Sequence, residues 1–432
     1  MRFFTALILY RLLLPLLFIV AFPGWVLKML RRGGRGTPLA ERVAYYSKPF
    51  ADESSEAVHL HAVSVGESLL AIKLIRQWLI EQPGQRFVLA TTTATGYAVA
   101  KAAMIPSIRV AYSPLDFKWM VGRYLDRFKP SQIVLIEGEV WPHLLLECKR
   151  RRIPVRLVNA RMSPRSTQRF TFFAEWLRPL YRLLDIVAIQ EPADASVWKL
   201  LGISPERIHL TGSLKFDSNS GEWPKFRQEF QEIIDAFGKN RPVVLAASTF
   251  PGEEVLIAKA IIEAVPDALP VIVPRHAERR SEVQAVLEHA GFVVCLRSLF
   301  QNGITVDDRD HVLVIDTTGE LRDWTAHADL VIIGKSFLST GGQNPCEAIL
   351  AEKPVICGAH MENFQPLVSQ LIAAHACISL KDPASLASAI LIALAPEKAR
   401  ALTTSASRVI SRHENATRRM IELLMAKSTS VF

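Results

Sequence analysis

From residue 57 onward, the sequence alternates short apolar runs with longer segments of mixed character. Runs of about four to eight continuously apolar residues are typical of parallel strands that helices cover on both faces. The segments between them, such as Leu69–Ile80 and Glu253–Ala264, have the length and spacing of helices. Repeated strand–helix units predict an α/β fold built from doubly wound parallel sheets. The expected strands are Val58–Val65, Phe87–Thr92, Ile108–Tyr112, Gln132–Ile136, Val155–Asn159 and Ile186–Gln190, then Val243–Ala247, Pro270–Pro274, Phe292–Leu296, Val312–Asp316, Leu330–Gly334 and Pro354–Gly358.

The expected strands fall into two sets, and this division predicts two domains. A chain of 432 residues is too long for one ordinary hydrophobic core. The polar stretch Asp217–Trp223 separates the sets. We therefore expect Rossmann-like domains at 33–218 and 219–432, with the last helix either in the second domain or returned to the first. Ligands of open α/β sheets bind outside the carboxyl ends of the strands, so we expect a cleft between facing sheets, lined by residues that follow strands.

The N-terminus is an apolar segment, residues 3–30, interrupted by Arg11, Pro15, Pro23 and Lys28. A helix needs about 20 apolar residues to cross a bilayer, so a crossing here requires Arg11 to face protein or to reach the interface. We predict that residues 1–32 form a membrane anchor helix, either a single span or a tilted interfacial helix. A buried core helix is the alternative. A cleaved signal peptide is disfavoured, because basic residues and no small-residue cleavage site follow the apolar run.

The charge distribution favours a membrane partner. Of the formal net charge of +9, residues 1–50 carry eight Lys and Arg side chains and one acid, that is 8 − 1 = +7. This concentration favours anionic lipids over nucleic acid as the partner. Trp25 followed by basic residues is typical of a membrane edge on the cytoplasmic side. The five cysteines form no CxxC pair, which argues against a disulfide framework and a zinc site.

Two acidic motifs follow expected strands of the first domain. Glu67 ends the segment HAVSVGE (61–67), where a strand gives way to a helix. A carboxylate there can accept a proton from an incoming hydroxyl, or it can simply be an acid that the helix dipole favours. Glu137 and Glu139 precede Trp141 and Pro142. These acids can bind sugar or acceptor hydroxyls, or they can form a solvated turn with Trp141 in the core.

Polar residues follow two further strands. Asn159 and Arg161 come after the strand at 155–159 and can line the cleft, or Asn159 can cap a helix. Arg275 follows the strand at 270–274 and can pair with a phosphate or a carboxylate, with a surface arginine as the alternative.

The segment GGQNPCE (341–347) combines two glycines with the start of an expected helix. Gly341 and Gly342 let the backbone approach a ligand closely, the helix N–H groups can point at a phosphate, and Glu347 can hold ribose hydroxyls. Glycine pairs are common in loops, so this motif alone is weak. The chain has no Walker loop and no GxGxxG segment near a first strand, which disfavours ATP hydrolysis and hydride transfer.

Eight segments, in chain order, carry a more specific pattern than any one motif: HAVSVGE, TTTATG, EGEVWP, NARMS, TGSLKFD, PRH, GGQNPCE and GAHMENF. Together with the apolar N-terminus, and up to about Phe364, they resemble the bacterial Kdo transferase family. Kdo is 3-deoxy-D-manno-oct-2-ulosonic acid, an acidic sugar of lipopolysaccharide. The resemblance implies a GT-B fold whose first domain binds the lipid A precursor (lipid IVA) and whose second binds CMP-Kdo. It also implies an inverting transfer that needs no metal ion or other cofactor.

The resemblance further implies roles for single residues. Glu67 is the general base, and Glu137 lies with it at the reacting centre. The acceptor side takes Ser64, Glu139, Trp141, Asn159 and Arg161, and the donor side takes Lys215, Arg275, His276, Gly341, Gly342, Asn344 and Glu347. Cationic side chains would offset the donor's phosphate and carboxylate, and the CMP phosphate would rest on the helix that follows the glycines. A phosphorylated lipid acceptor fits an anchored enzyme with a basic segment.

The chain departs from the usual pattern of that family at several positions. Gln343 stands where histidine is usual in the glycine loop, and Phe250 where histidine is usual in STFPGEE (248–254). Lys335 interrupts a turn that usually has small residues, and Gly138 and Val140 replace the common Thr and Leu of the acidic motif. These changes bear on the donor side more than on the reaction class.

Two other functions stay open at this point. One is a GT-B transferase that uses another nucleotide sugar on a membrane acceptor. The other is a membrane-tethered scaffold protein with a decayed site, against which the intact Glu67, Arg275, Asn344 and Glu347 argue.

Overall fold

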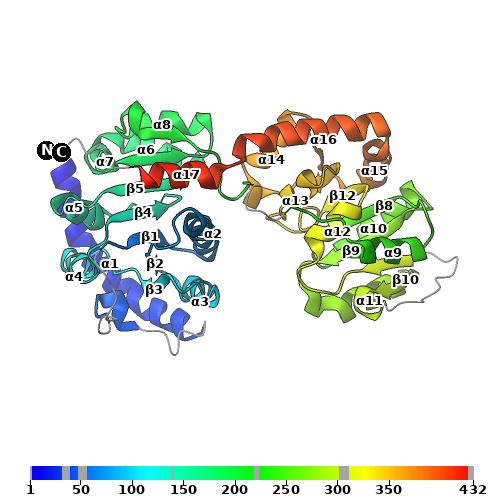
Figure 1. Ribbon diagram of the computed structural model, residues 1–432, viewed down its shortest axis with the longest axis horizontal. Coiled ribbons are helices and arrows are strands. Elements are labelled where there is room, and N and C mark those ends of the chain that lie inside the picture. The colour runs from blue at the N-terminus through cyan, green and yellow to red at the C-terminus, as the bar shows by residue number, and fades with distance from the viewer. Residues whose placement is uncertain are drawn as a thin grey trace. The chain divides into compact units, whose positions relative to one another are not determined.

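The computed structural model describes residues 2–31, 39–46, 56–138, 140–162, 164–217, 223–300 and 311–426, without the side chains at 22–23, 25–31, 39 and 164–165. The chain divides into two compact units (Figure 1). The first unit contains residues 1–220 and 415–432, and the second contains residues 221–414.

The first unit is built on a parallel sheet of seven strands within the described residues, in the order β3-β2-β1-β4-β5-β6-β7. The strands are β1 (Val58–Ala62), β2 (Phe87–Thr91), β3 (Ile108–Tyr112), β4 (Gln132–Ile136), β5 (Val155–Ala160), β6 (Ile186–Ile189) and β7 (Ile208–Leu210). The helices are α1 (Arg2–Arg31), α2 (Val65–Glu81), α3 (Ala94–Ala102), α4 (Lys118–Phe128), α5 (Pro142–Arg150), α6 (Pro164–Phe172), α7 (Ala174–Tyr181), α8 (Ala195–Leu200) and α17 (Ala416–Met425).

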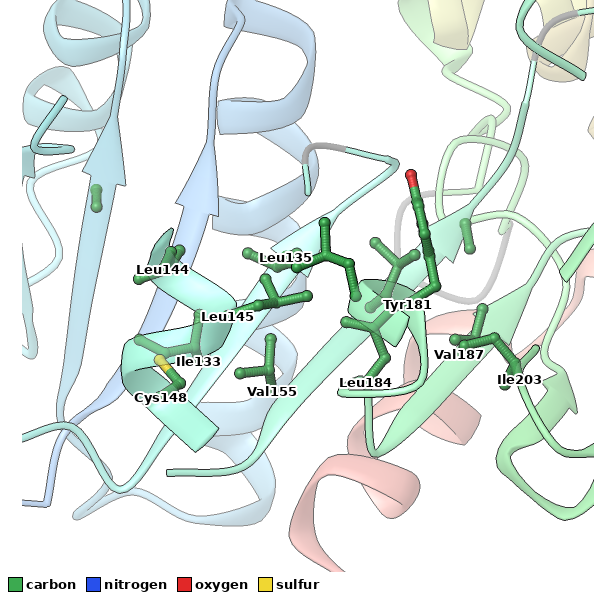
Figure 2. Packing of buried hydrophobic residues seen from close by; sticks show 14 of the residues in the cluster. Ile133, Leu135, Leu144, Leu145, Cys148, Val155, Tyr181, Leu184, Val187 and Ile203 are labelled. Carbon is green, nitrogen blue, oxygen red and sulfur yellow. The ribbon is translucent and has the colours of Figure 1, made fainter. Parts of the chain in front are cut away.

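Helices cover both faces of this sheet, as its continuously apolar strands require. Side chains of α2, α3 and α17 bury one face, and side chains of α4, α5, α7 and α8 bury the other. Figure 2 shows the second of these cores, where Leu145 and Cys148 of α5 lie against Ile133 and Val155 of β4 and β5. Each such buried aliphatic side chain contributes roughly 1.5–3 kcal/mol relative to exposure.

The second unit repeats the plan with its own parallel sheet, which has seven strands over 223–300 and 311–414, in the order β10-β11-β9-β8-β12-β13-β14. The strands are β8 (Val243–Thr249), β9 (Leu269–Pro274), β10 (Val293–Leu296), β11 (His311–Val314), β12 (Leu330–Ile333), β13 (Val355–Gly358) and β14 (Ile378–Leu380). The helices are α9 (Gln228–Ala236), α10 (Glu253–Ala264), α11 (Arg280–His289), α12 (Leu321–His327), α13 (Cys346–Leu350), α14 (Leu367–Ala373), α15 (Leu386–Leu394) and α16 (Pro396–Ile410).

The predicted α/β class is confirmed, and every expected apolar run contains a strand. Two edge strands, β7 and β14, were not predicted. Each has three residues and is only partly buried, so neither shows the continuous apolar run of a central strand. The first expected strand was too long, because the chain leaves β1 after Ala62 and α2 begins at Val65.

The last helix, α17, belongs to the first unit, one of the two alternatives that the sequence left open. Arg156 of β5 donates hydrogen bonds to the carbonyls of Leu423, Leu424 and Ala426, at 3.0, 2.5 and 2.9 Å. These carbonyls at the end of the helix have no partners within the helix itself, so a buried arginine there closes it. Of the expected linker Asp217–Trp223, residues 218–222 lie outside the described residues.

The N-terminal helix α1 lies along the first unit. Its segment Arg2–Ala21, with 20 residues and a mean hydropathy of 2.3, is long and apolar enough to cross a membrane. One stripe of the helix is half-buried against the unit. On this side Tyr10 donates to Asp116 at 2.8 Å, and Arg11, which is itself exposed, donates to His143 Nε2 at 3.3 Å. The exposed side presents Phe4, Ile8, Leu9, Leu12, Leu13, Leu16, Leu17, Ile19 and Val20. The side chains of the basic stretch after Trp25, including Lys28, Arg31, Arg32 and Arg35, lie outside the described part of the chain.

Candidate functional site

Glu67 lies in the first turn of α2, directly after β1, and its carboxylate is held by two donors. The backbone N–H of Val63 donates to Oε2 at 2.7 Å, and the Ser64 hydroxyl donates to Oε1 at 2.8 Å. Ser64 is also the N-cap of the helix, because its oxygen accepts from the Glu67 N–H at 3.3 Å. Each carboxylate oxygen can accept a second hydrogen bond. The residue therefore both starts the helix and keeps the capacity to accept a proton.

Glu137 follows β4, the strand next to β1, and belongs to the same site. Its backbone is left-handed, with φ of +67°, and its carbonyl accepts from the Arg161 N–H at 3.2 Å. Burial raises the pKa of Glu137, and the nearby charge of Glu67 raises that pKa further. The cations Arg161 and Lys215 act in the opposite direction. Two carboxylates and two cations thus interact: Glu67, Glu137 and Arg161 follow β1, β4 and β5, and Lys215 follows β7.

Asn159 has a role that the sequence did not predict. It is fully buried, and its Oδ1 accepts from the Leu214 N–H at 2.9 Å. It neither caps a helix nor faces solvent. Lys73 of α2 holds the same turn by donating to the carbonyls of Leu214 and Asp217, both at 2.8 Å. Asn159 and Lys73 therefore fix the turn that carries Lys215, and no local sequence pattern marks Lys73.

The acidic motif is only partly described. Trp141 is 37% exposed and lies at the start of α5, so it is at the surface instead of in the core. A surface tryptophan beside two acids suits contact with an amphipathic ligand. Glu139 lies outside the described residues.

A second group of predicted residues lies in the second unit, at the carboxyl ends of its strands. Arg275 follows β9, and Glu347 lies in the first turn of α13. Burial raises the pKa of Glu347, while Arg322 and Arg275 lower it. The carboxylate therefore lies in the field of both guanidinium groups, and Arg322, on α12, was missed. His276 follows Arg275, and its ring centroid lies 6.2 Å from that of Phe250.

The glycine loop is built differently from the expectation. Gly341 and Gly342 have φ of +115° and +68°, which favour glycine. A Cβ on Gly341 would lie 2.6 Å from Asn363 Nδ2, so the loop is packed against the segment 360–363. The N–H of Gly341 donates to Glu362 Oε2 at 2.6 Å, and that of Gly342 donates to the Lys335 carbonyl at 2.9 Å.

At the start of α13, a backbone N–H group is also already hydrogen-bonded within the chain. Asn344 Oδ1 accepts from the Cys346 N–H at 3.1 Å, and the helix has five residues. Because the glycine N–H groups are also paired, an anion at this loop would be bound mainly by side chains. The glycines serve to bring two loops together.

Comparison with known proteins agrees with this architecture. Residues 37–218 match the family described as 3-deoxy-D-manno-octulosonic-acid transferase (kdotransferase). A relative named 3-deoxy-D-manno-octulosonic acid transferase, from Bordetella pertussis, is 34% identical over 85% of this chain and 86% of its own. One of the same name from Haemophilus influenzae is 28% identical over 89% and 90% of the two chains.

A solved structure gives the likeness in fold. The UDP-GlcNAc 2-epimerase of Neisseria meningitidis, bound to UDP-GlcNAc, is 12% identical and has a TM-score of 0.53 over 85% of this chain and 99% of its own. At this identity the likeness concerns the fold alone, with two Rossmann-like domains in each chain. The identity to the Bordetella protein over most of both chains, together with the match at 37–218, shows that this chain is a glycosyltransferase of the 3-deoxy-D-manno-octulosonic-acid transferase family.

Proposed function

We propose that this protein transfers Kdo from CMP-Kdo to the lipid A precursor, lipid IVA, with inversion at the anomeric carbon, in lipopolysaccharide biosynthesis. The observation that carries the proposal is the pair Glu67 and Glu137, flanked by Arg161 and Lys215. Such a pair suits proton transfer next to anionic substrates.

Glu67 is the general base. Burial and the nearby charge of Glu67 raise the pKa of Glu137, so Glu137 is protonated more readily than an ordinary glutamate. Glu67, whose carboxylate is held by the Val63 N–H and the Ser64 hydroxyl, accepts the proton from the primary hydroxyl of the acceptor. The hydroxyl oxygen attacks the anomeric carbon of Kdo from the side opposite to the CMP phosphate. The bond between that carbon and the phosphate oxygen breaks, and its electron pair leaves with CMP.

Departure of CMP needs electrostatic help and no proton, because the phosphate is already anionic. Arg275 and Lys215 offset the negative charges of the donor. Glu347 holds the ribose hydroxyls, with Asn344 and His276 beside the same strand ends. Ser64, Glu139, Trp141, Asn159 and Arg161 make up the acceptor side, Asn159 by supporting the turn that carries Lys215. No metal ion takes part in this proposal.

The membrane is the second partner. The helix α1 presents a continuous apolar side that the first unit does not cover. With the positive charge of residues 1–50, it would hold the enzyme on anionic lipids at the cytoplasmic face of the inner membrane. An enzyme that meets its lipid acceptor there avoids extracting it from the bilayer.

Transfer with purified protein, CMP-Kdo and lipid IVA, followed by mass spectrometry of the lipid, tests the proposal. The expected product is heavier by one or more Kdo residues. Protection against thermal unfolding by CMP and not by UDP identifies the nucleotide. Protection by UDP alone would indicate another nucleotide sugar, and CMP binding without any Kdo transfer would favour a scaffold.

A further inference from the structure

Lys335 and Phe250 lie side by side at the carboxyl edge of the second sheet. Lys335 follows β12 and Phe250 follows β8, and these strands pair in parallel, with Ile333 opposite Ala247. The Lys335 ammonium lies 4.6 Å from the centroid of the Phe250 ring. Arg275 follows β9, the other neighbour of β8. The ammonium therefore belongs to the edge that carries the predicted donor residues.

A single buried carboxylate fixes both residues. Glu253, in the first turn of α10, is fully buried. Its oxygens accept from the N–H groups of Lys335 at 2.6 Å, Ser336 at 3.0 Å, Phe337 at 3.1 Å and Phe250 at 3.0 Å. Lys335 is also held in a left-handed conformation, with φ of +55°. This network holds the backbone of Phe250 and of Lys335 in place, so the aromatic ring and the lysine side chain are positioned together without a bound ligand.

Lys335 is half-buried, and its ammonium has no carboxylate at ion-pair distance among the residues that the structure describes. It lies 3.6 Å from where a Cβ on Gly341 would be, directly beside the glycine loop. The N–H groups of both glycines in that loop already donate hydrogen bonds within the chain. A cation placed there and steadied over an aromatic ring attracts an anion that the backbone of the loop cannot bind.

We propose that Lys335 binds the phosphate of the nucleotide donor, with Phe250 as the positioning residue for its ammonium. The proposal rests on the proposed function for the identity of the donor. Phe250 and Lys335 are two of the positions at which this chain departs from the common motif pattern. Because their side chains are in contact, we treat the two departures as a single change.

The test compares the affinities of the full-length protein, in detergent, for CMP and for cytidine by titration calorimetry. Lys335→Met should raise the Kd for CMP about tenfold, the loss of one charge-assisted contact, and leave that for cytidine unchanged. Lys335→Arg should retain most of the CMP affinity. Lys398→Met, at an exposed lysine of α16, is the matched control and should change neither value.

Phe250→Leu should raise the Kd for CMP about threefold, with no change for cytidine and little change in the melting temperature, since it keeps an apolar side chain but removes the ring under the ammonium. An unchanged Kd for CMP in Lys335→Met would overturn the proposal. If the KM for CMP-Kdo rose in the same variant, the lysine would contact the sugar carboxylate instead of the phosphate. An equal loss for cytidine would also overturn it. A wild-type protein that binds no CMP would reject the donor itself, which is a separate failure of the proposed function.

Discussion

Replacing Glu253 by glutamine should destabilise the second unit strongly, although the change removes only a charge. The carboxylate is fully buried and accepts four backbone hydrogen bonds, two on each oxygen. Glutamine keeps one acceptor oxygen and turns an NH₂ group toward the two remaining N–H donors. At least two bonds to a charged acceptor are lost, each worth about 1.5–3 kcal/mol, so we expect a loss of about 3 kcal/mol or more.

For a unit of this size, about 3 kcal/mol corresponds to a fall in melting temperature of roughly 6–12 °C. Scanning calorimetry of the full-length protein in detergent measures it, because the two units can unfold separately. Glu288→Gln, at an exposed position of α11, is the matched control and should change the melting temperature little. A melting temperature of Glu253→Gln within about 2 °C of the control would refute the view that this carboxylate organises the edge of the sheet.

Three further outcomes are expected. Glu67→Ala should lower the rate of transfer at least a hundredfold and leave CMP affinity unchanged, since a general base contributes roughly 10²–10⁴ in rate; turnover close to wild type would remove Glu67 from the mechanism. Arg156→Met should release α17 and speed tryptic cleavage after residue 415, and an unchanged cleavage rate would show that other contacts hold the helix. Burial lowers the pKa of His61 from 6.5 to about 4. Between these values the folded protein binds fewer protons than the unfolded chain, so the free energy of unfolding should fall by up to about 3 kcal/mol as pH drops from about 6.5 to 4, with a shallower slope in His61→Gln.

The fold was largely predictable because parallel strands that are buried on both faces have continuously apolar sequences. The same rule missed β7 and β14, whose three residues are too few and too exposed to form such a run. The meeting of Glu67 with Glu137 was predictable from one geometric fact, because these residues follow the neighbouring strands β1 and β4. Residues that follow neighbouring parallel strands lie at the same edge of a sheet.

Residues whose side chains bond to backbone groups far away in the sequence were not predictable. Glu253 resembles any acid at the start of a helix, yet its partners at 335–337 are more than eighty positions away in sequence. The contact between Lys335 and Phe250 is equally non-local. The packing of the glycine loop was not predictable for a related reason. Its glycines permit a close approach, but the approaching group is another loop of the same chain.

The docking of α1 has a practical consequence for any shortened form of this enzyme. Asp116, which accepts from Tyr10, also accepts from the N–H groups of His143 and Leu144, both at 2.9 Å. It thereby caps the start of α5, directly after the acidic motif and Trp141. Removing the first 31 residues to obtain a water-soluble protein would remove Tyr10, one of the hydrogen-bond donors to Asp116, and would expose His143. Such a truncation therefore alters the start of α5 beside Trp141, and its kinetics would not describe the full-length enzyme.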